Sequence, residues 1–202
     1  MGIEIPQNKF LILDGAMGTV LQQRGLSPQG RPELLNLTEP ELLNSVYKEY
    51  IAAGSQVIYA NTFGANGLKL AKTGHSVEEV VGAAIAVAKK AAAGTGTLVA
   101  LDVGPLGELL EPMGTLSFER AYDLFREMAE AGAKAGADLI VVETMTDLYE
   151  AKAALLAAKE AAHLPVFVTM SFDAGGRTFT GCTVASMART LEGLGADAIG
   201  LD

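Results

Sequence analysis

Polar side chains come directly after each of six short apolar runs in this sequence. In chain order they are Asp14, Asn61 with Thr62, Asp102, Glu143 with Thr144, Ser171, and Asp202. Asp, Asn, Ser and Thr also favour turns and helix caps, so any one of them alone is better explained as a turn residue or a cap. Glu143 differs, because Glu is a poor turn former and here follows four apolar residues. We therefore take Glu143 as the strongest single candidate for a functional side chain.

The segment 14–19, Asp-Gly-Ala-Met-Gly-Thr, has the composition of a ligand-binding turn. It follows an apolar run and opens what we predict to be a short helix. Glycine lets the backbone approach a ligand closely, and the free N–H groups at a helix start suit a carboxylate or a phosphate. Many turns between a strand and a helix contain two glycines, so the pattern is not specific by itself.

Asp14, Asp102 and Glu143 together would form an acidic wall beside this turn. Such a site suits an amino acid, because its ammonium and carboxylate groups need partners of opposite charge. It also suits a divalent cation such as magnesium, which carboxylates hold in barrels of the aldolase or enolase kind. The residues by themselves leave both ligands open.

These side chains must be positioned by alternating strands and helices. Apolar runs that predict strands occupy residues 10–13, 57–60, 98–101, 139–142, 166–170 and 198–201. Patterns that predict helices occupy residues 39–53, 77–93, 118–135, 148–162 and 184–194, with N-caps expected at Thr38, Ser76, Ser117 and Asp147. The strand runs are apolar on both faces, as in a parallel sheet that is covered on both sides.

The same β/α unit recurs along the chain. Three helix-to-strand junctions, at residues 53–58, 135–140 and 194–199, look alike, each with glycine where the helix ends. Without a dinucleotide-type glycine turn, this repeat favours a (β/α)8 barrel over a doubly wound sheet. We predict the α/β class and an incomplete TIM-type barrel of about six strands and five helices, forming one domain over residues 1–202. In such a barrel the site lies at the carboxyl ends of the strands.

Composition narrows the classes of protein further. The chain has 202 residues, of which 50% are hydrophobic, and a net charge of -9 with scattered Lys and Arg, which argues against a nucleic-acid partner. It has no apolar stretch long enough for a membrane span and no secretory signal pattern, so we expect a cytoplasmic protein that binds a small molecule.

At the same residues the sequence resembles the homocysteine S-methyltransferase family, and within it the homocysteine-binding domain of cobalamin-dependent methionine synthase. The shared segments follow one another in order, at the family's spacing, over nearly the whole chain. They are LDGAMGT at 13–19, ELLNLT at 33–38, ANTFGAN at 60–66, DVGP at 102–105, LLEP at 109–112, VETM at 142–145 and TMSF at 169–172.

The resemblance implies a barrel in which zinc binds the homocysteine sulfur as a thiolate that attacks a methyl group. A thiol with a pKa of about 8.5 is mostly protonated at neutral pH, and a metal holds it deprotonated. Methylcobalamin is the implied methyl donor, although other domains of that family bind it. The implied substrate-binding residues are Asp14, Gly15, Ala16, Thr62 and Glu143, with Glu143 at the amino group. No residue is assigned a catalytic role.

The sequence departs from the family at the metal. Three cysteines hold zinc in the family, the first after a Gly-x-Asn at the end of the sixth strand, whereas residues 200–202 here are Gly-Leu-Asp and the sequence stops there. The single cysteine, Cys182, matches no ligand position, so we assign no metal ligand. We therefore expect a homocysteine S-methyltransferase domain for methionine synthesis that is inactive as given.

Two other hypotheses remain. One is a non-catalytic truncated barrel that assembles with itself or with a partner chain, because open strand edges invite pairing. The other is a carboxylate–magnesium enzyme, which the matching segments disfavour.

Overall fold

A parallel sheet forms the centre of the computed structural model, which describes residues 10–27 and 30–202. Within these residues five strands pair in the order β1-β2-β3-β4-β5. Their bounds are β1 Val57–Tyr59, β2 Leu98–Val103, β3 Leu139–Met145, β4 Val166–Met170 and β5 Ala198–Leu201. Neighbours in the sheet are consecutive along the chain, which is the strand order of a (β/α)8 barrel.

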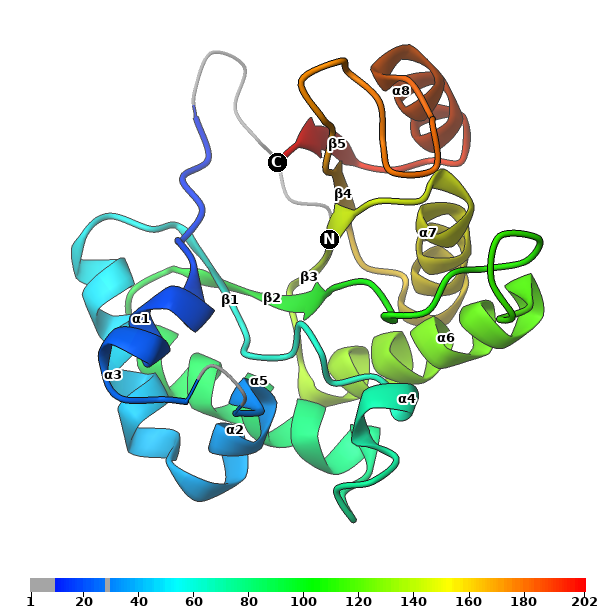
Figure 1. Cartoon of the computed structure of the whole chain (residues 1–202). Helices are drawn as coiled ribbons and strands as arrows, with labels where there is room; N and C mark the ends of the chain where they lie inside the picture. Colours follow the sequence, from blue (N-terminus) through cyan, green and yellow to red (C-terminus); the bar gives the residue numbers. More distant parts are fainter. Residues whose placement is uncertain (1–9, 28–29) are drawn as a thin grey trace.

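Long helices connect the strands and lie on the outer side of the curved sheet (Figure 1). They are α3 Pro40–Ala52, α5 Val77–Ala92, α6 Phe118–Ala135, α7 Leu148–Ala162 and α8 Val184–Gly193. The predicted helix ranges are confirmed to within one residue at each end. Ser76, Ser117 and Asp147 cap their helices as predicted, each accepting a hydrogen bond from a backbone N–H of the first turn.

The N-cap predicted at Thr38 is wrong, because Thr38 ends a separate short helix, α2 Leu35–Thr38, and Glu39 is the N-cap of α3. The reason is Pro40, which takes the first helical position and disfavours helical geometry in the residue before it. Three further short helices are α1 Met17–Gln23, the 3₁₀ helix η1 Pro32–Leu34 and α4 Gly67–Leu70. The short helix predicted after Asp14 is therefore confirmed as α1.

Side chains of each strand alternate between two buried clusters. Ile58, Val99 and Ile140 face the helices and belong to the large outer core. Val57, Ala100, Leu139, Val141 and Phe167 face the inside of the curved sheet and form the smaller inner cluster. The strands are apolar on both faces because both faces are buried, as the sequence pattern predicted.

The predicted first strand, residues 10–13, does not form in the structure. Only Leu13 makes a parallel bridge, to Val57 of β1, and Phe10 is 93% exposed. Side chains add to the backbone bonds on both sides of this bridge, because Gln56 Oε1 accepts the N–H of Ile12 at 3.0 Å and Asp14 Oδ2 accepts the N–H of Tyr59 at 2.9 Å. Residues 10–13 therefore lie beside β1 and pair with it at a single bridge. They do not form a sixth strand. The fold class itself, an incomplete α/β barrel, is confirmed.

Candidate functional site

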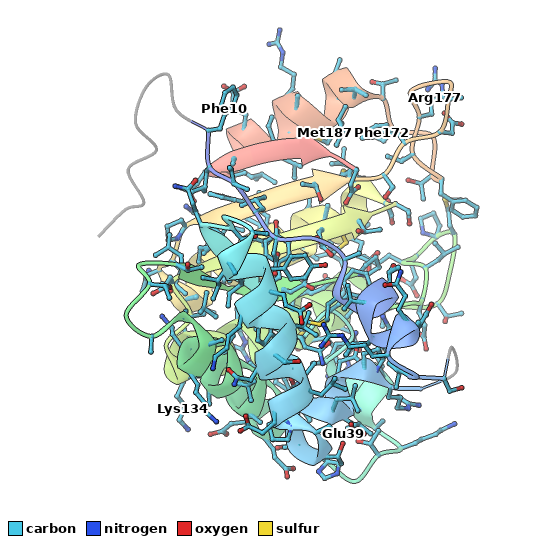
Figure 2. All side chains as sticks on the ribbon, turned by 90° about the vertical axis from the view of Figure 1, so that its left-hand side faces the viewer. Phe10, Glu39, Lys134, Phe172, Arg177 and Met187 are labelled. Carbon is cyan, nitrogen blue, oxygen red and sulfur yellow. The ribbon has the colours of Figure 1, made fainter. Side chains whose placement is uncertain are left out.

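The carboxyl ends of the strands surround a cavity of about 460 Å3. Figure 2 shows the strand arrows pointing toward the end of the molecule at which Phe172 and Arg177 lie. The polar residues of the cavity wall come from segments far apart in the sequence. They are Asp14, Glu33, Tyr59, Asn61, Asp102, Glu143, Thr144 and Asp202.

Strand alternation explains why acidic side chains meet there. Asp102 follows Ala100 by two residues on β2, and Glu143 follows Val141 by two residues on β3, so both continue the row that faces the inside of the sheet. Asp202 stands in the same relation to Gly200 at the end of β5. The inner face is thus apolar along the strands and acidic at their carboxyl ends.

Asp14 lies at the beginning of the acidic wall. Its Oδ2 atom accepts the Tyr59 N–H, while its buried Oδ1 atom has no hydrogen-bond partner among the described residues. Burial raises the pKa of Asp14 to about 7, although the hydrogen bond from Tyr59 acts in the opposite direction. A buried acceptor without a partner is costly, so Asp14 is ready to receive a positively charged or donating group.

Asp102 lies deeper, and only 7% of it is exposed. Its Oδ1 atom also has no partner in the described part of the chain. Burial, followed by the charges of Glu143 and Asp14, raises the pKa of Asp102 well above its ordinary value. Three neighbouring carboxyls, those of Asp14, Asp102 and Glu143, cannot all ionise cheaply in a buried site, which is why the pKa of each is raised.

Glu143 lies between Asp14 and Asp102 on one side and Asp202 on the other. Burial, and after it the negative charge of Asp202, raise the pKa of Glu143 to about 7. No Lys, Arg or His is found among the described residues that line the cavity. The wall therefore lacks its own counter-charge and suits a cationic group of a ligand.

The turn that leads into α1 also lines the cavity. Ala16 is the N-cap of α1, and no side chain among the described residues caps it, so the first amides of the helix are open to a ligand. A Cβ atom at Gly15 would lie 3.1 Å from the Tyr50 ring and hydroxyl, so a larger residue there would require Tyr50 to shift. Acidic side chains and the uncapped start of α1 thus line one cavity.

A network of amides and carbonyls supports the outer rim. Asn61 Nδ2 donates to the Pro32 carbonyl at 2.6 Å, and Asn36 Nδ2 donates to the Asn61 carbonyl at 2.8 Å. Glu33 Oε1 accepts the Gly64 N–H at 2.8 Å. These bonds tie the segment before α2 to the turn after β1 and fix the cavity's edge.

Four of the five predicted substrate-binding residues line this cavity: Asp14, Gly15, Ala16 and Glu143. The fifth, Thr62, is fully buried, and its hydroxyl donates to the Asp102 carbonyl at 2.7 Å and accepts the Asp102 N–H at 3.0 Å. Thr62 thus holds the backbone of Asp102 and does not line the cavity. Sequence reasoning also missed Tyr59, which lies inside an apolar run; its period-2 relation to inward-facing Val57 was the available signal.

The described residues do not fit the zinc site that the family resemblance implies. They contain no group of three or more His, Cys, Asp or Glu side chains arranged to hold a metal ion. Cys182 lines a separate cavity with Asp147 and Tyr149, and burial raises the pKa of its thiol. A half-buried thiol that lines another cavity is not a zinc ligand for this one.

Fold and site together define an α/β-barrel protein with an acidic small-molecule cavity at the carboxyl ends of its strands. The chain matches the homocysteine S-methyltransferase family over residues 11–202 and belongs to that family. It is 30% identical, over 220 aligned residues, to the methionine synthases of Mycobacterium tuberculosis (strain ATCC 25618 / H37Rv) and Mycobacterium leprae (strain TN). The alignment covers 99% of this chain and 18% of each relative's length.

Solved structures agree with this family. The metallated form of the homocysteine methyltransferase MmuM from Escherichia coli superposes with a TM-score of 0.84 at 25% identity, covering 96% of this chain and 75% of that one. Its oxidised form gives the same TM-score at 26% identity. The carboxyl transferase domain of Rhizobium etli pyruvate carboxylase, at 20% identity and a TM-score of 0.52, bears on the fold alone.

The described residues contain no candidate membrane-spanning helix. No helix there combines the length and the apolar composition that crossing a bilayer requires.

Proposed function

We propose that the cavity binds homocysteine and that this chain supplies the substrate-binding part of a homocysteine S-methyltransferase domain in methionine synthesis. The observation that carries the proposal is the pairing of an acidic wall, without a counter-charge among its described residues, with the open amides at the beginning of α1. Family membership supports homocysteine as the amino acid.

The two ends of the amino acid would bind on the two sides of the cavity. Glu143 and Asp14 would receive the ammonium group, which supplies the positive charge and the donors that the buried carboxyls lack. The carboxylate would take the amides of the Gly15–Gly18 turn, where the helix dipole favours negative charge. Tyr59 and Phe63 would contact the side chain between them.

Zinc and methylcobalamin remain proposals from the family for the complete methyl transfer, in which zinc would hold the substrate sulfur as a thiolate. No residue of this chain is assigned to either, and the chain as given is proposed to bind substrate without transferring a methyl group. We also propose that residues 1–202 form one domain and act in the cytoplasm; residues 1–9, 28 and 29 lie outside the described part.

The second candidate is a protein that assembles through its open edges. Ile199 and Leu201 of β5 are 41% and 58% exposed, and Phe10 and Ile12 are exposed near the other end of the arc. Exposed apolar residues along an unpaired strand favour association with another chain.

Calorimetric titration of the chain with homocysteine, with and without zinc, tests the first proposal. We expect saturable binding that Glu143→Gln weakens by about tenfold or more, because a charge-assisted hydrogen bond to the ammonium is lost. The control is Glu192→Gln, at an exposed position of α8, which should leave binding unchanged. Equal affinities of wild type and Glu143→Gln would contradict the proposed pose.

The pH dependence of this titration has a definite sign. The pKa values of Asp14 and Glu143 are raised to about 7, so below that pH both carboxyls are mostly neutral and cannot pair with an ammonium group. Affinity should therefore rise as the pH increases from about 5.5 to 8, a range in which ordinary carboxyls are already ionised. A pH-independent affinity would show that neither carboxyl receives the ligand's charge.

A further inference from the structure

Asp202 makes more hydrogen bonds than any acid described above. Its Oδ2 atom accepts the Thr144 N–H at 2.8 Å, the Thr144 hydroxyl at 3.1 Å and the Thr169 hydroxyl at 2.8 Å. Its Oδ1 atom accepts the Ser171 hydroxyl at 3.0 Å. One carboxylate at the end of β5 thus joins the carboxyl ends of β3 and β4.

Thr144, which donates two of these bonds, has an unusual backbone. Its φ is 60°, in the left-handed region that β-branched residues rarely adopt. The register between β3 and β4 also shifts between Val142 and Met145, so Glu143 and Thr144 form an irregular bulge in β3. Strained residues of this kind persist only where their surroundings hold them, and bulges redirect side chains near sites.

We propose that Asp202 is a positioning residue for the amino-acid cavity: it holds Thr144 in the left-handed conformation and so directs the adjacent Glu143 into the cavity. The inference rests on the proposed function, in which Glu143 receives the ligand's ammonium group. It gives Asp202 a geometric role through Thr144 that is separate from the role of its charge.

The charge has its own effect, because Asp202 acts on Glu143 across the cavity. The groups that face Glu143 from the other elements are Asp14 before α1, Tyr59 of β1, Asp102 of β2 and Asp202 after β5. None of them is cationic, so removing the charge of Asp202 lowers the pKa of Glu143.

Two substitutions separate geometry from charge. In Asp202→Asn the amide oxygen can still accept the Thr144 N–H and the Thr169 hydroxyl, and the amide nitrogen can donate to Ser171, so the bulge is kept while the charge is lost. Asp202→Ala removes both the hydrogen bonds that hold the bulge and the charge. Ser171→Ala is the matched control, because it removes one bond of Asp202 and none to Thr144.

Calorimetric titration with homocysteine at about pH 6 and pH 8 gives the first readout. We expect Asp202→Asn to bind as wild type does at the higher pH and more tightly at the lower pH, where more Glu143 is ionised. Asp202→Ala should bind about tenfold more weakly at the higher pH. It should lose less affinity at the lower pH, where removing the charge of Asp202 also leaves more Glu143 ionised, and Ser171→Ala should be unchanged at both. Adding Thr144→Gly to Asp202→Ala should restore part of the affinity, because glycine adopts positive φ without strain.

If Asp202→Asn and Asp202→Ala weaken homocysteine binding equally at the higher pH, the proposal is overturned, since Asp202 would then contact the ligand through its charge. Failure of Thr144→Gly to restore any affinity would also overturn it.

A second readout needs no ligand and therefore stands even if homocysteine does not bind. NMR of ¹³C-glutamate-labelled protein gives the titration midpoint of Glu143, and ¹⁵N spectra give the shift of the Thr144 amide. We expect Asp202→Asn and Asp202→Ala to lower the titration midpoint of Glu143 alike. Only Asp202→Ala should move the amide resonance of Thr144 far from its wild-type shift. Absence of homocysteine binding with these NMR results would reject the proposed function alone, whereas an unmoved Thr144 amide in Asp202→Ala would reject the role of Asp202.

Discussion

Gly104 shows how one residue without a side chain shapes the cavity wall. A Cβ atom at this position would lie 2.5 Å from the ring of Phe63, which lines the cavity. The Gly104 N–H also donates to the Phe63 carbonyl at 3.0 Å, so the two backbones are held close together. The aromatic wall therefore depends on glycine after β2.

We predict that Gly104→Ala lowers the free energy of unfolding by about 1–3 kcal/mol, because the new methyl group displaces a packed ring. Urea denaturation measures this change, and homocysteine titration should show weaker binding. Gly82→Ala in α5 is the control: no described atom lies within 4 Å of its added Cβ atom, and we expect it to stabilise the protein by about 0.5–1 kcal/mol. Equal stabilities of the two variants would contradict this account of Gly104.

At the scale of elements, the three similar helix-to-strand junctions share one hydrogen-bonding device. The side chain two residues after the junction glycine (Gly54, Gly136 or Gly195) accepts a backbone N–H from the preceding strand segment. Asp138 Oδ2 accepts Val99 N–H at 2.7 Å, Asp197 Oδ2 accepts Val166 N–H at 2.8 Å and Gln56 Oε1 accepts Ile12 N–H at 3.0 Å. Both aspartates also pair with a lysine of an earlier helix, Lys89 or Lys159. The device fixes the register between neighbouring strands.

Asp138→Ala should therefore lower the free energy of unfolding by about 1–3 kcal/mol, because it leaves the Val99 N–H without its acceptor. Asp138→Asn keeps an oxygen there and should lose less. Lys89→Met tests the ion pair alone and should cost at most about 1 kcal/mol, since the pair is partly exposed. If Lys89→Met costs as much as Asp138→Ala in urea denaturation, the ion pair and not the backbone bond supplies the stability.

At the scale of the whole molecule, the inner cluster of the described sheet is small and its last strand has a free edge. β5 pairs with β4 on one side, and its residues Ile199 and Leu201 are 41% and 58% exposed. The segment before α1 carries exposed Phe10 and Ile12. Figure 1 shows β5 and this segment at the two ends of the arc of strands.

We predict that the chain self-associates through β5 at tens of micromolar, a concentration at which unpaired apolar edges commonly pair. Ile199→Lys places a charge on this edge and should shift sedimentation profiles toward monomer. Phe179→Lys, in the exposed loop before α8, removes apolar surface away from the edge and serves as the control. A wild-type chain that stays monomeric over this range would reject the assembly hypothesis.

The sequence by itself determined the helices, the α/β class and the family. Strand and helix periods, glycines at helix ends and capping residues are local signals, so the long helices were predicted to within one residue. The same logic placed Asp14 and Glu143 at strand ends, and the structure brings them to one cavity. It could not show that residues 10–13 pair only at Leu13, because strand formation depends on partners distant in sequence.

Only the tertiary structure decided which polar residues face the cavity. Thr62 and Asp102 both follow apolar runs. The hydroxyl of Thr62, however, hydrogen-bonds to the backbone of Asp102, whereas the side chain of Asp102 lines the cavity. The left-handed Thr144 and its bonds to Asp202 join residues 58 positions apart, which no local pattern encodes. The physical reason is that side-chain direction follows from strand register, and register is set by pairing between segments far apart in the chain.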